Sequence, residues 1–114
     1  MNTKVLNQLL SQKCELKVGR IQNVTWNVDK LKILKIRDTI LLLNGVIIYE
    51  DLDHQIYISN MKGGFLRKNT AHTAFCLENS KLHIAIYANE GMINQHTCED
   101  VINEIKKALS EFIK

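Results

Sequence analysis

The chain contains no proline in its 114 residues, although average usage of about 5% would supply roughly six. This absence excludes cis-proline turns, proline-rich ligand motifs and stiff proline linkers. Cysteine is also scarce: Cys14, Cys76 and Cys98 are far apart and odd in number, which does not fit a disulfide framework. Residues 1–13 hold no apolar stretch of signal-peptide length. We therefore expect a reduced protein in the cytoplasm.

The sequence also lacks a long apolar run and a strong charge of one sign. The longest apolar stretch, residues 39–49, is interrupted by Asn44 and Gly45 and falls short of the ~20 residues that span a bilayer, so we expect no transmembrane segment. Aromatic residues make up 6% of the chain and the formal net charge is +3. Such a chain offers neither the stacking side chains nor the positive charge that favour nucleic acid as a partner.

No sequence motif supplies a metal cluster, a nucleophile elbow, a phosphate loop or a nucleotide fingerprint. The glycine pair at 63–64 is not followed by the Lys-Ser or Lys-Thr of a phosphate loop. The pairs His72/Cys76 and His96/Cys98 lack a second ligand pair at zinc-site spacing. We expect no cofactor, no metal ion and no enzymatic activity.

What the chain does contain is the composition of one globular domain, which we place at residues 1–114. Hydrophobic residues make up 46% of the sequence and charged residues 24%, and no linker or repeat interrupts it. Apolar residues at helical spacing predict a short helix over Thr3–Lys13. The same spacing predicts an amphipathic helix that begins at Thr97 and carries its apolar stripe to Ile113.

Alternating apolar residues predict strands in the middle of the chain. They lie at Asn23–Asp29, with Trp26 in the core, and at Gln55–Ser59, Ala74–Leu77 and Leu82–Tyr87, the last two joined by a turn at Asn79–Lys81. The segment Thr39–Tyr49 predicts a hairpin, because Asn44-Gly45 is the usual pair of a type I′ turn. We therefore expect an α+β fold, with a mostly antiparallel six- to seven-stranded sheet or open barrel, a short N-terminal helix and a C-terminal amphipathic helix packed on it.

A basic strand is predicted over Lys30–Arg37, which reads K-L-K-I-L-K-I-R. Its alternation slips between Ile33 and Leu34, and a β-bulge there would turn the apolar side chains inward and the cations outward. Four cations on one face would attract phosphates, acidic lipids or an acidic protein. Lysines also protect edge strands against aggregation, and both interpretations stay open. The candidate binding residues are the cations of this strand and of the loop at 61–73: Lys30, Lys32, Lys35, Arg37, Lys62, Arg67 and Lys68.

Cys98 and His54 are the residues on which an enzymatic alternative would rest. Cys98 lies in the first turn of the predicted C-terminal helix, where the pKa of a thiol can fall. His54 follows a cluster of carboxylates formed by Glu50, Asp51 and Asp53. We interpret the cluster as a solvated acidic turn and the thiol as unreactive, and keep a small enzyme as the second alternative.

The order of these elements resembles the pleckstrin-homology-like architecture. The resemblance is carried by Lys17-Val18-Gly19, Trp26, the basic strand ending at Arg37, Ile40–Leu43, Phe75-x-Leu77 and the helix from Cys98 to Ile113. It implies a site for phosphoinositides on the first two strands, which would place binding residues at Lys17, Lys30, Lys32 and Arg37. Many members of that family bind proteins instead of lipids.

The chain also resembles secretion-effector chaperones, which place helices at both ends of a twisted sheet, and toxin-immunity proteins, which are small single domains without a catalytic constellation. Acidic surfaces are typical of such proteins, so the net charge of +3 argues against both classes. We therefore expect a non-enzymatic binding module or adaptor that engages a protein partner and contacts anionic lipid through its basic strand. A bacterial toxin-immunity protein or a secretion-effector chaperone is the alternative.

Overall fold

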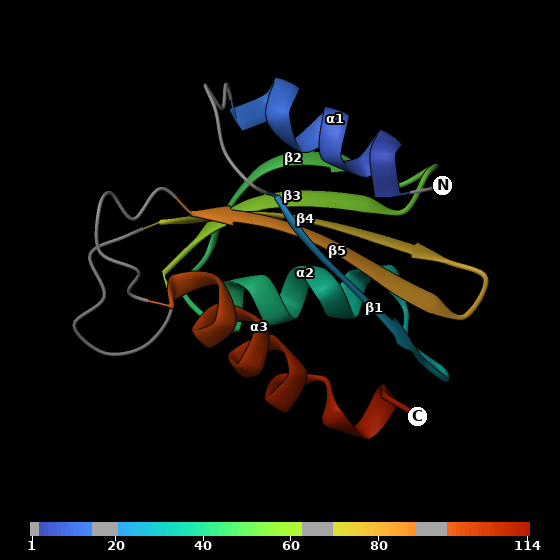
Figure 1. Cartoon of the computed structure of the whole chain (residues 1–114). Coiled ribbons are helices and arrows are strands. Elements are labelled where there is room, and N and C mark those ends of the chain that lie inside the picture. Colours follow the sequence, from blue (N-terminus) through green and yellow to red (C-terminus); the bar gives the residue numbers. More distant parts are fainter. Residues whose placement is uncertain (1–2, 15–20, 63–69, 89–95) are drawn as a thin grey trace.

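The computed structural model describes residues 3–14, 21–62, 70–88 and 96–114. Along the chain, a helix, a strand and a second helix precede four consecutive strands and a last helix (Figure 1). The elements are α1 (Thr3–Cys14), β1 (Gln22–Asn27), α2 (Ile33–Leu42), β2 (Val46–Asp51), β3 (Ile56–Met61), β4 (Ala71–Glu78), β5 (Lys81–Ala88), α3 (Thr97–Ala108) and the 3₁₀ turn η1 (Ser110–Phe112).

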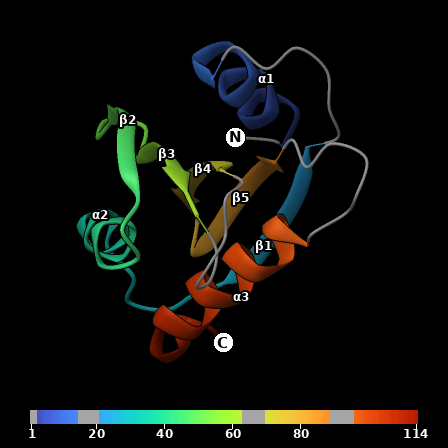
Figure 2. The same ribbon diagram turned by 90° about the vertical axis from the view of Figure 1, so that its left-hand side faces the viewer.

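The five strands form one antiparallel sheet in the order β1-β5-β4-β3-β2. Helix α1 covers one face of the sheet over β4 and β5, and the other two helices cover the opposite face (Figures 1 and 2). On that face α2 lies over β2 and β3, while α3 lies over β4 and β5. The expected six- to seven-stranded sheet or open barrel is therefore wrong. The described residues form five strands, because a helix takes the place of the expected basic strand and of the first strand of the hairpin.

Helix α2 occupies the segment for which a bulged basic strand is expected. Read at helical spacing, Ile33, Ile36, Ile40 and Leu43 share one side, and this side packs into the core with Ile36 and Ile40 almost fully buried. The slip in alternation reflects this helical period and not a bulge. Isoleucine is a modest helix former because its β-branch restricts χ1. Burial against the sheet, more than local preference, therefore decides the conformation of this segment.

The Asn44-Gly45 pair ends α2 and does not form the expected hairpin turn. The Gly45 N–H donates to the Ile40 carbonyl at 2.8 Å and the Asn44 N–H donates to the Leu41 carbonyl at 3.1 Å, which are the two bonds of a Schellman motif. Asn44 adopts the left-handed conformation with a φ of 61°. Close approach requires a glycine at position 45, since a Cβ there would lie 2.8 Å from Ile40 Cγ2. The pair thus joins a helix to β2.

The strands that follow pair as hairpins. The β4–β5 hairpin confirms the turn predicted at Asn79–Lys81, because Asn79 and Ser80 both have positive φ, as a two-residue type I′ loop requires. β2 pairs with β3 across the acidic turn, and its register shifts between Ile47 and Tyr49. This bulge lies in a strand at the edge of the sheet, which is where bulges are common.

The sheet separates two apolar clusters. On the α1 face, Leu6 and Leu10 are fully buried against residues of β3, β4 and β5. The larger cluster on the opposite face joins α2, α3 and the sheet. Its largest fully buried side chains are Tyr57, Phe75, Ile36, Ile40, Leu82, Ile84, Ile86, Ile105 and Leu109. Because helices cover both faces, the central strands carry apolar residues at both parities.

The end of the chain attaches α3 to β1. Helix α3 ends at Ala108, before the end of the predicted apolar stripe, and η1 follows it. Val28 and Ile113 then form an isolated antiparallel bridge, and the Lys114 N–H donates to the Asn27 carbonyl at 3.0 Å. Trp26, expected in the core, is partly buried against the larger cluster. Strand β1 is thus held by β5 on one side and by the chain end on the other.

Candidate functional site

The four cations of the expected basic strand lie on two different elements. Lys30 and Lys32 are exposed in the connection between β1 and α2. Lys35 and Arg37 lie on α2, where residues two apart point to nearly opposite sides because each residue turns the helix by roughly 100°. The structure therefore does not gather these four side chains on one face.

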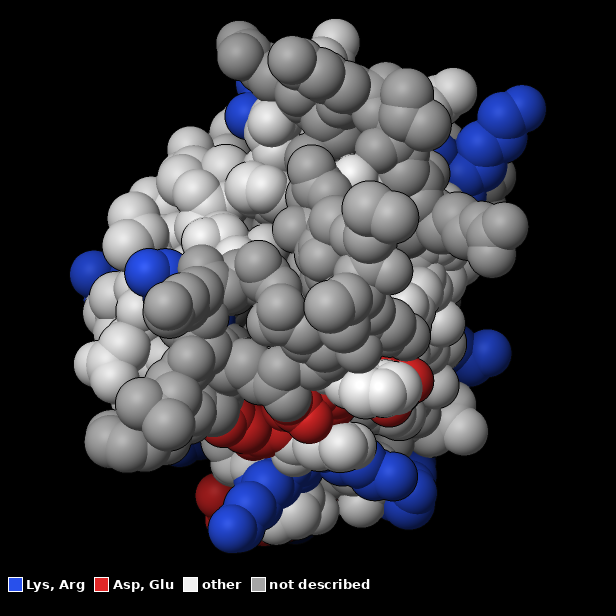
Figure 3. Space-filling view, turned by 60° about the vertical axis from the view of Figure 1, so that its left-hand side comes forward, with Lys and Arg blue, Asp and Glu red and all other residues white. Residues whose placement is uncertain are grey.

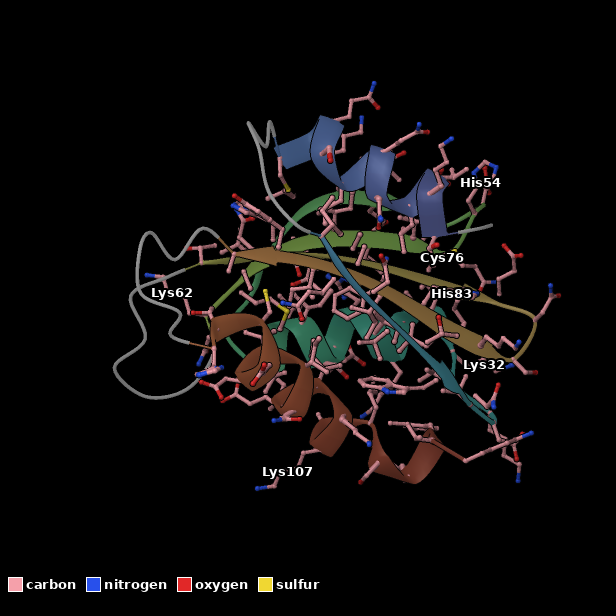
Figure 4. The ribbon with its side chains drawn as sticks, viewed as in Figure 1. Lys32, His54, Lys62, Cys76, His83 and Lys107 are labelled. Carbon is pink, nitrogen blue, oxygen red and sulfur yellow. The ribbon has the colours of Figure 1, made fainter. Side chains whose placement is uncertain are left out.

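Of the three loop cations in the expected binding set, the structure describes Lys62. Lys62 directly follows β3 and lines a cleft of about 480 Å³ between the C-terminal end of α2 and α3, together with Glu104 and Lys107. Figure 4 shows Lys62 and Lys32 at opposite ends of the molecule. Arg67 and Lys68 lie outside the described residues. A single anion-binding surface made of both sets is therefore not formed by the residues that the structure describes.

Three connections meet in a groove of about 820 Å³ at the end of the sheet where Lys30 and Lys32 lie. We call it the turn groove, because the β1–α2 connection, the β2–β3 turn and the β4–β5 turn line it. Its charged and titratable lining residues are Lys30, Lys32, Asp53, His54 and Glu78. Cations and carboxylates of similar number face the same space. The groove therefore lacks the potential of one sign that would select a phosphate or an acidic headgroup.

Asp51 holds the β2–β3 turn at one wall of the turn groove. The His54 N–H donates to Asp51 Oδ1 at 3.1 Å, and the His54 ring Nδ1 lies 2.8 Å from Asp51 Oδ2. The ring contact first, and then the backbone hydrogen bond, hold the pKa of Asp51 below its ordinary value. Gln55 ends the turn with a φ of 56°, and its carbonyl accepts from the Leu77 N–H at 3.1 Å. These contacts give His54 a role in turn geometry.

His54 and Cys98, the residues of the enzymatic alternative, lie in different surroundings. Cys98 is 7% exposed and packs in the larger apolar cluster beneath α3. His54 is exposed and lines the turn groove, which does not include Cys98. Within the described ranges, no group of three His, Cys, Asp or Glu side chains is placed to share a metal ion.

Large apolar side chains are exposed on α2 and on the edge strand β2 that follows it. We define the α2–β2 surface by five large apolar side chains with their exposed fractions: Leu34 56%, Leu41 48%, Leu42 72%, Val46 63% and Ile48 40%. Single exposed apolar side chains are normal on a protein, but neighbouring ones on adjacent elements are typical of interaction sites. On the left-hand side of the view in Figure 3, the described surface is mostly white, with isolated Lys and Arg side chains projecting from it.

Strand β2 adds an open sheet edge to this surface. Among the residues that the structure describes, it pairs with β3 alone. Its sequence, VIIYED, contains neither lysine nor proline, the residues that commonly protect such an edge. Backbone N–H and C=O groups are therefore available beside the exposed side chains of Val46 and Ile48.

Charged groups border the α2–β2 surface. Arg37 and Asp38 are exposed on α2, and Glu50 on β2 lies opposite Tyr57 of β3. Burial raises the pKa of the Tyr57 phenol, and the nearby Glu50 carboxylate raises it further. The phenol therefore stays neutral at physiological pH, and the charges at this border come from Arg37, Asp38 and Glu50.

The sequence interpretation misses the α2–β2 surface because it assigns both apolar runs to the strands of one hairpin. One signal for it is present in the sequence. The α2 segment carries three leucines beyond the residues that face the sheet, which is more than one helical stripe can bury. The three extra leucines indicate an exposed apolar surface only once the segment is known to be a helix.

No protein-family model and no curated protein sequence matches the chain. In the part of the chain that the structure describes, no helix has the length and apolarity needed to cross a bilayer.

Proposed function

We propose that the chain is a non-enzymatic binding module that contacts a protein partner through the α2–β2 surface. The observation that supports this proposal is the exposure of five large apolar side chains at one edge of the sheet. Covering a fully exposed side chain of this kind contributes about 1.5–3 kcal/mol, and covering one that is already half-buried contributes about half of that. The cores of protein interfaces are depleted of charge and rich in apolar side chains. The surface thus fits a protein partner better than it fits a charged headgroup.

The basic residues take a smaller part in this proposal. Attachment to anionic lipid needs several cations on one face, whereas Lys30 and Lys32 share the turn groove with Asp53 and Glu78. Arg37 is retained from the expected binding set, since it borders the α2–β2 surface. Binding to phosphatidylserine vesicles that weakens sharply as salt is raised would instead favour the lipid alternative.

We also propose a reducing, cytoplasmic setting for the protein. It is supported by Cys14, Cys76 and Cys98, which are thiols and not disulfides. The pleckstrin-homology resemblance stays a prediction on which the proposed function does not depend. Lys17 lies outside the described residues, and Ile40–Leu43 belongs to the end of a helix instead of a strand.

Affinity capture from the native cell tests the proposal. The variant Leu41→Lys places a charge in the α2–β2 surface, and Val5→Lys makes the same kind of change on α1, across the sheet. The two positions are matched, since Leu41 is 48% exposed and Val5 is 44% exposed. We expect Leu41→Lys to lose the partner that the wild type and Val5→Lys both retain. Equal capture by all three proteins would contradict the proposed surface.

A further inference from the structure

We propose that the partner of α2 is a second copy of this chain, docked with the two α2 helices parallel about a twofold axis that runs along them. The inference rests on the proposed function, because it names the partner of part of the same α2–β2 surface. It concerns the contact of α2 with α2 of the second copy.

The order of residues along the exposed side of α2 supports this pairing. Leu34 and Leu41 are seven positions apart, which is about two helical turns, so they lie almost on one line along the helix. Both are about half exposed. Arg37 and Asp38, both exposed, flank the midpoint of that line. Along the exposed side of α2, a leucine is therefore followed by a cation, an anion and a second leucine.

This arrangement is complementary to itself when the two helices run in the same direction. In a parallel pair, each leucine faces the same leucine of the second copy, and Arg37 on one flank faces Asp38 of the second copy. The twofold axis repeats the charge contact, so the pair has one leucine contact at each end and two opposite-charge contacts at its centre. An antiparallel pair would bring equal flanks together and so place like charges opposite each other, which is unfavourable. The order of residues on the exposed side thus favours the parallel twofold arrangement.

The position of α2 in the fold leaves this side accessible. Helix α2 lies over β2 and β3 at one edge of the sheet, while α3 covers β4 and β5 (Figure 2). The buried side of α2 faces the sheet through Ile36 and Ile40. A second helix can therefore approach the opposite side without displacing any element of the described residues.

Sedimentation velocity over a concentration series of the full chain measures the association. We expect the mass to rise with concentration from 13.1 kDa toward twice that value. Arg37→Asp or Asp38→Arg alone places like charges opposite each other, and each variant should weaken the dimer by about tenfold or more. Lys106→Asp makes a matched charge change on the exposed face of α3 and should leave the association unchanged.

Restoration of binding is the decisive result. In an equimolar mixture of Arg37→Asp and Asp38→Arg, one copy presents two anions and the other presents two cations, so a mixed dimer should form. The double variant Arg37→Asp/Asp38→Arg should likewise dimerise as the wild type does. Only a self-pairing contact predicts both restorations, because a different partner would not change its own charges.

Two outcomes would overturn the inference. One is a mass of 13.1 kDa at concentrations up to roughly 1 mM, where a dimer with a Kd of about 1 mM would be detected. The other is a dimer that Arg37→Asp and Asp38→Arg leave unaltered. If the chain is monomeric and Leu41→Lys still abolishes capture of a different protein, the proposed function stands and the second copy is excluded. If capture is also unaltered, both fail.

Discussion

Substituting Gly45 tests how the Asn44-Gly45 pair ends α2. A Cβ at this position would lie 2.8 Å from Ile40 Cγ2, 3.0 Å from the Ile40 carbonyl oxygen and 3.2 Å from Met61 Cγ. The Gly45 N–H also donates to that carbonyl at 2.8 Å, so the backbone cannot move away without lengthening a Schellman hydrogen bond. Gly45→Ala should therefore force Ile40, which is fully buried, out of its packed position.

The expected loss of stability in Gly45→Ala is the difference between two opposing effects. Forcing an extra carbon into a packed site costs about 1–3 kcal/mol. Replacing glycine by alanine also restricts the unfolded chain, which stabilises the protein by about 0.4–1 kcal/mol. The free energy of unfolding should thus fall by about 1–2 kcal/mol. For a domain of this size, this corresponds to a drop in Tm of roughly 4–8 °C. This is a substantial part of the stability of a small domain.

Urea unfolding followed by circular dichroism measures this loss, and two further variants locate its cause. Asn44→Gly should change stability by less than about 0.5 kcal/mol, because glycine accepts the positive φ of this position. Ile40→Leu removes the nearest carbon, Cγ2, so Gly45→Ala should cost less in that background than in the wild type. A Gly45→Ala protein as stable as the wild type, or an equal loss in both backgrounds, would refute the reasoning.

Three further measurements check the electrostatics and burial of other groups. The pKa of Asp51 is lowered from 3.8 by His54, so its contribution to stability is present above that value and is lost as pH falls through the lowered pKa. Asp51→Asn should therefore reduce stability at neutral pH and match the wild type at the acid end of a denaturation series. Burial lowers the pKa of His72 from 6.5, so stability should fall as pH drops below 6.5, and an NMR titration of the ring should show a midpoint under that value; a midpoint at or above it would contradict the burial of the ring. Burial raises the pKa of Cys14 and Cys76 above 9.0, so both thiols should react slowly with a disulfide reagent at neutral pH and rapidly in denaturant, and equal rates in the two conditions would show that they are exposed.

Several elements could be predicted from the sequence because their signals are local. The apolar spacing of α1 and α3 and the alternation of β1 each extend over a few turns or residues, and the β4–β5 loop carries Asn79 and Ser80 where a type I′ turn needs positive φ. Such patterns depend on backbone geometry within one element. They hold whatever the element later packs against.

The segment of α2 could not be assigned in this way. Its apolar residues fit a strand with one slip and also a helix, and a left-handed asparagine followed by glycine serves both a type I′ turn and a Schellman motif. Choosing between them depends on which side chains the rest of the fold can bury. The candidate site could not be predicted for the same reason, because the cations of Lys30–Arg37 share a face only if the segment is a strand.

By itself, the sequence determined that helices lie near both ends of the chain, that strands lie between them and that no long apolar segment is present. The tertiary structure decided that residues 33–42 are a helix, that β2 is an edge and that five apolar side chains stay exposed beside that edge. The physical reason is that turn and spacing preferences act over a few residues. Burial is a property of the assembled layers, and it decides which conformation an ambiguous apolar segment adopts and which of its side chains remain for a partner.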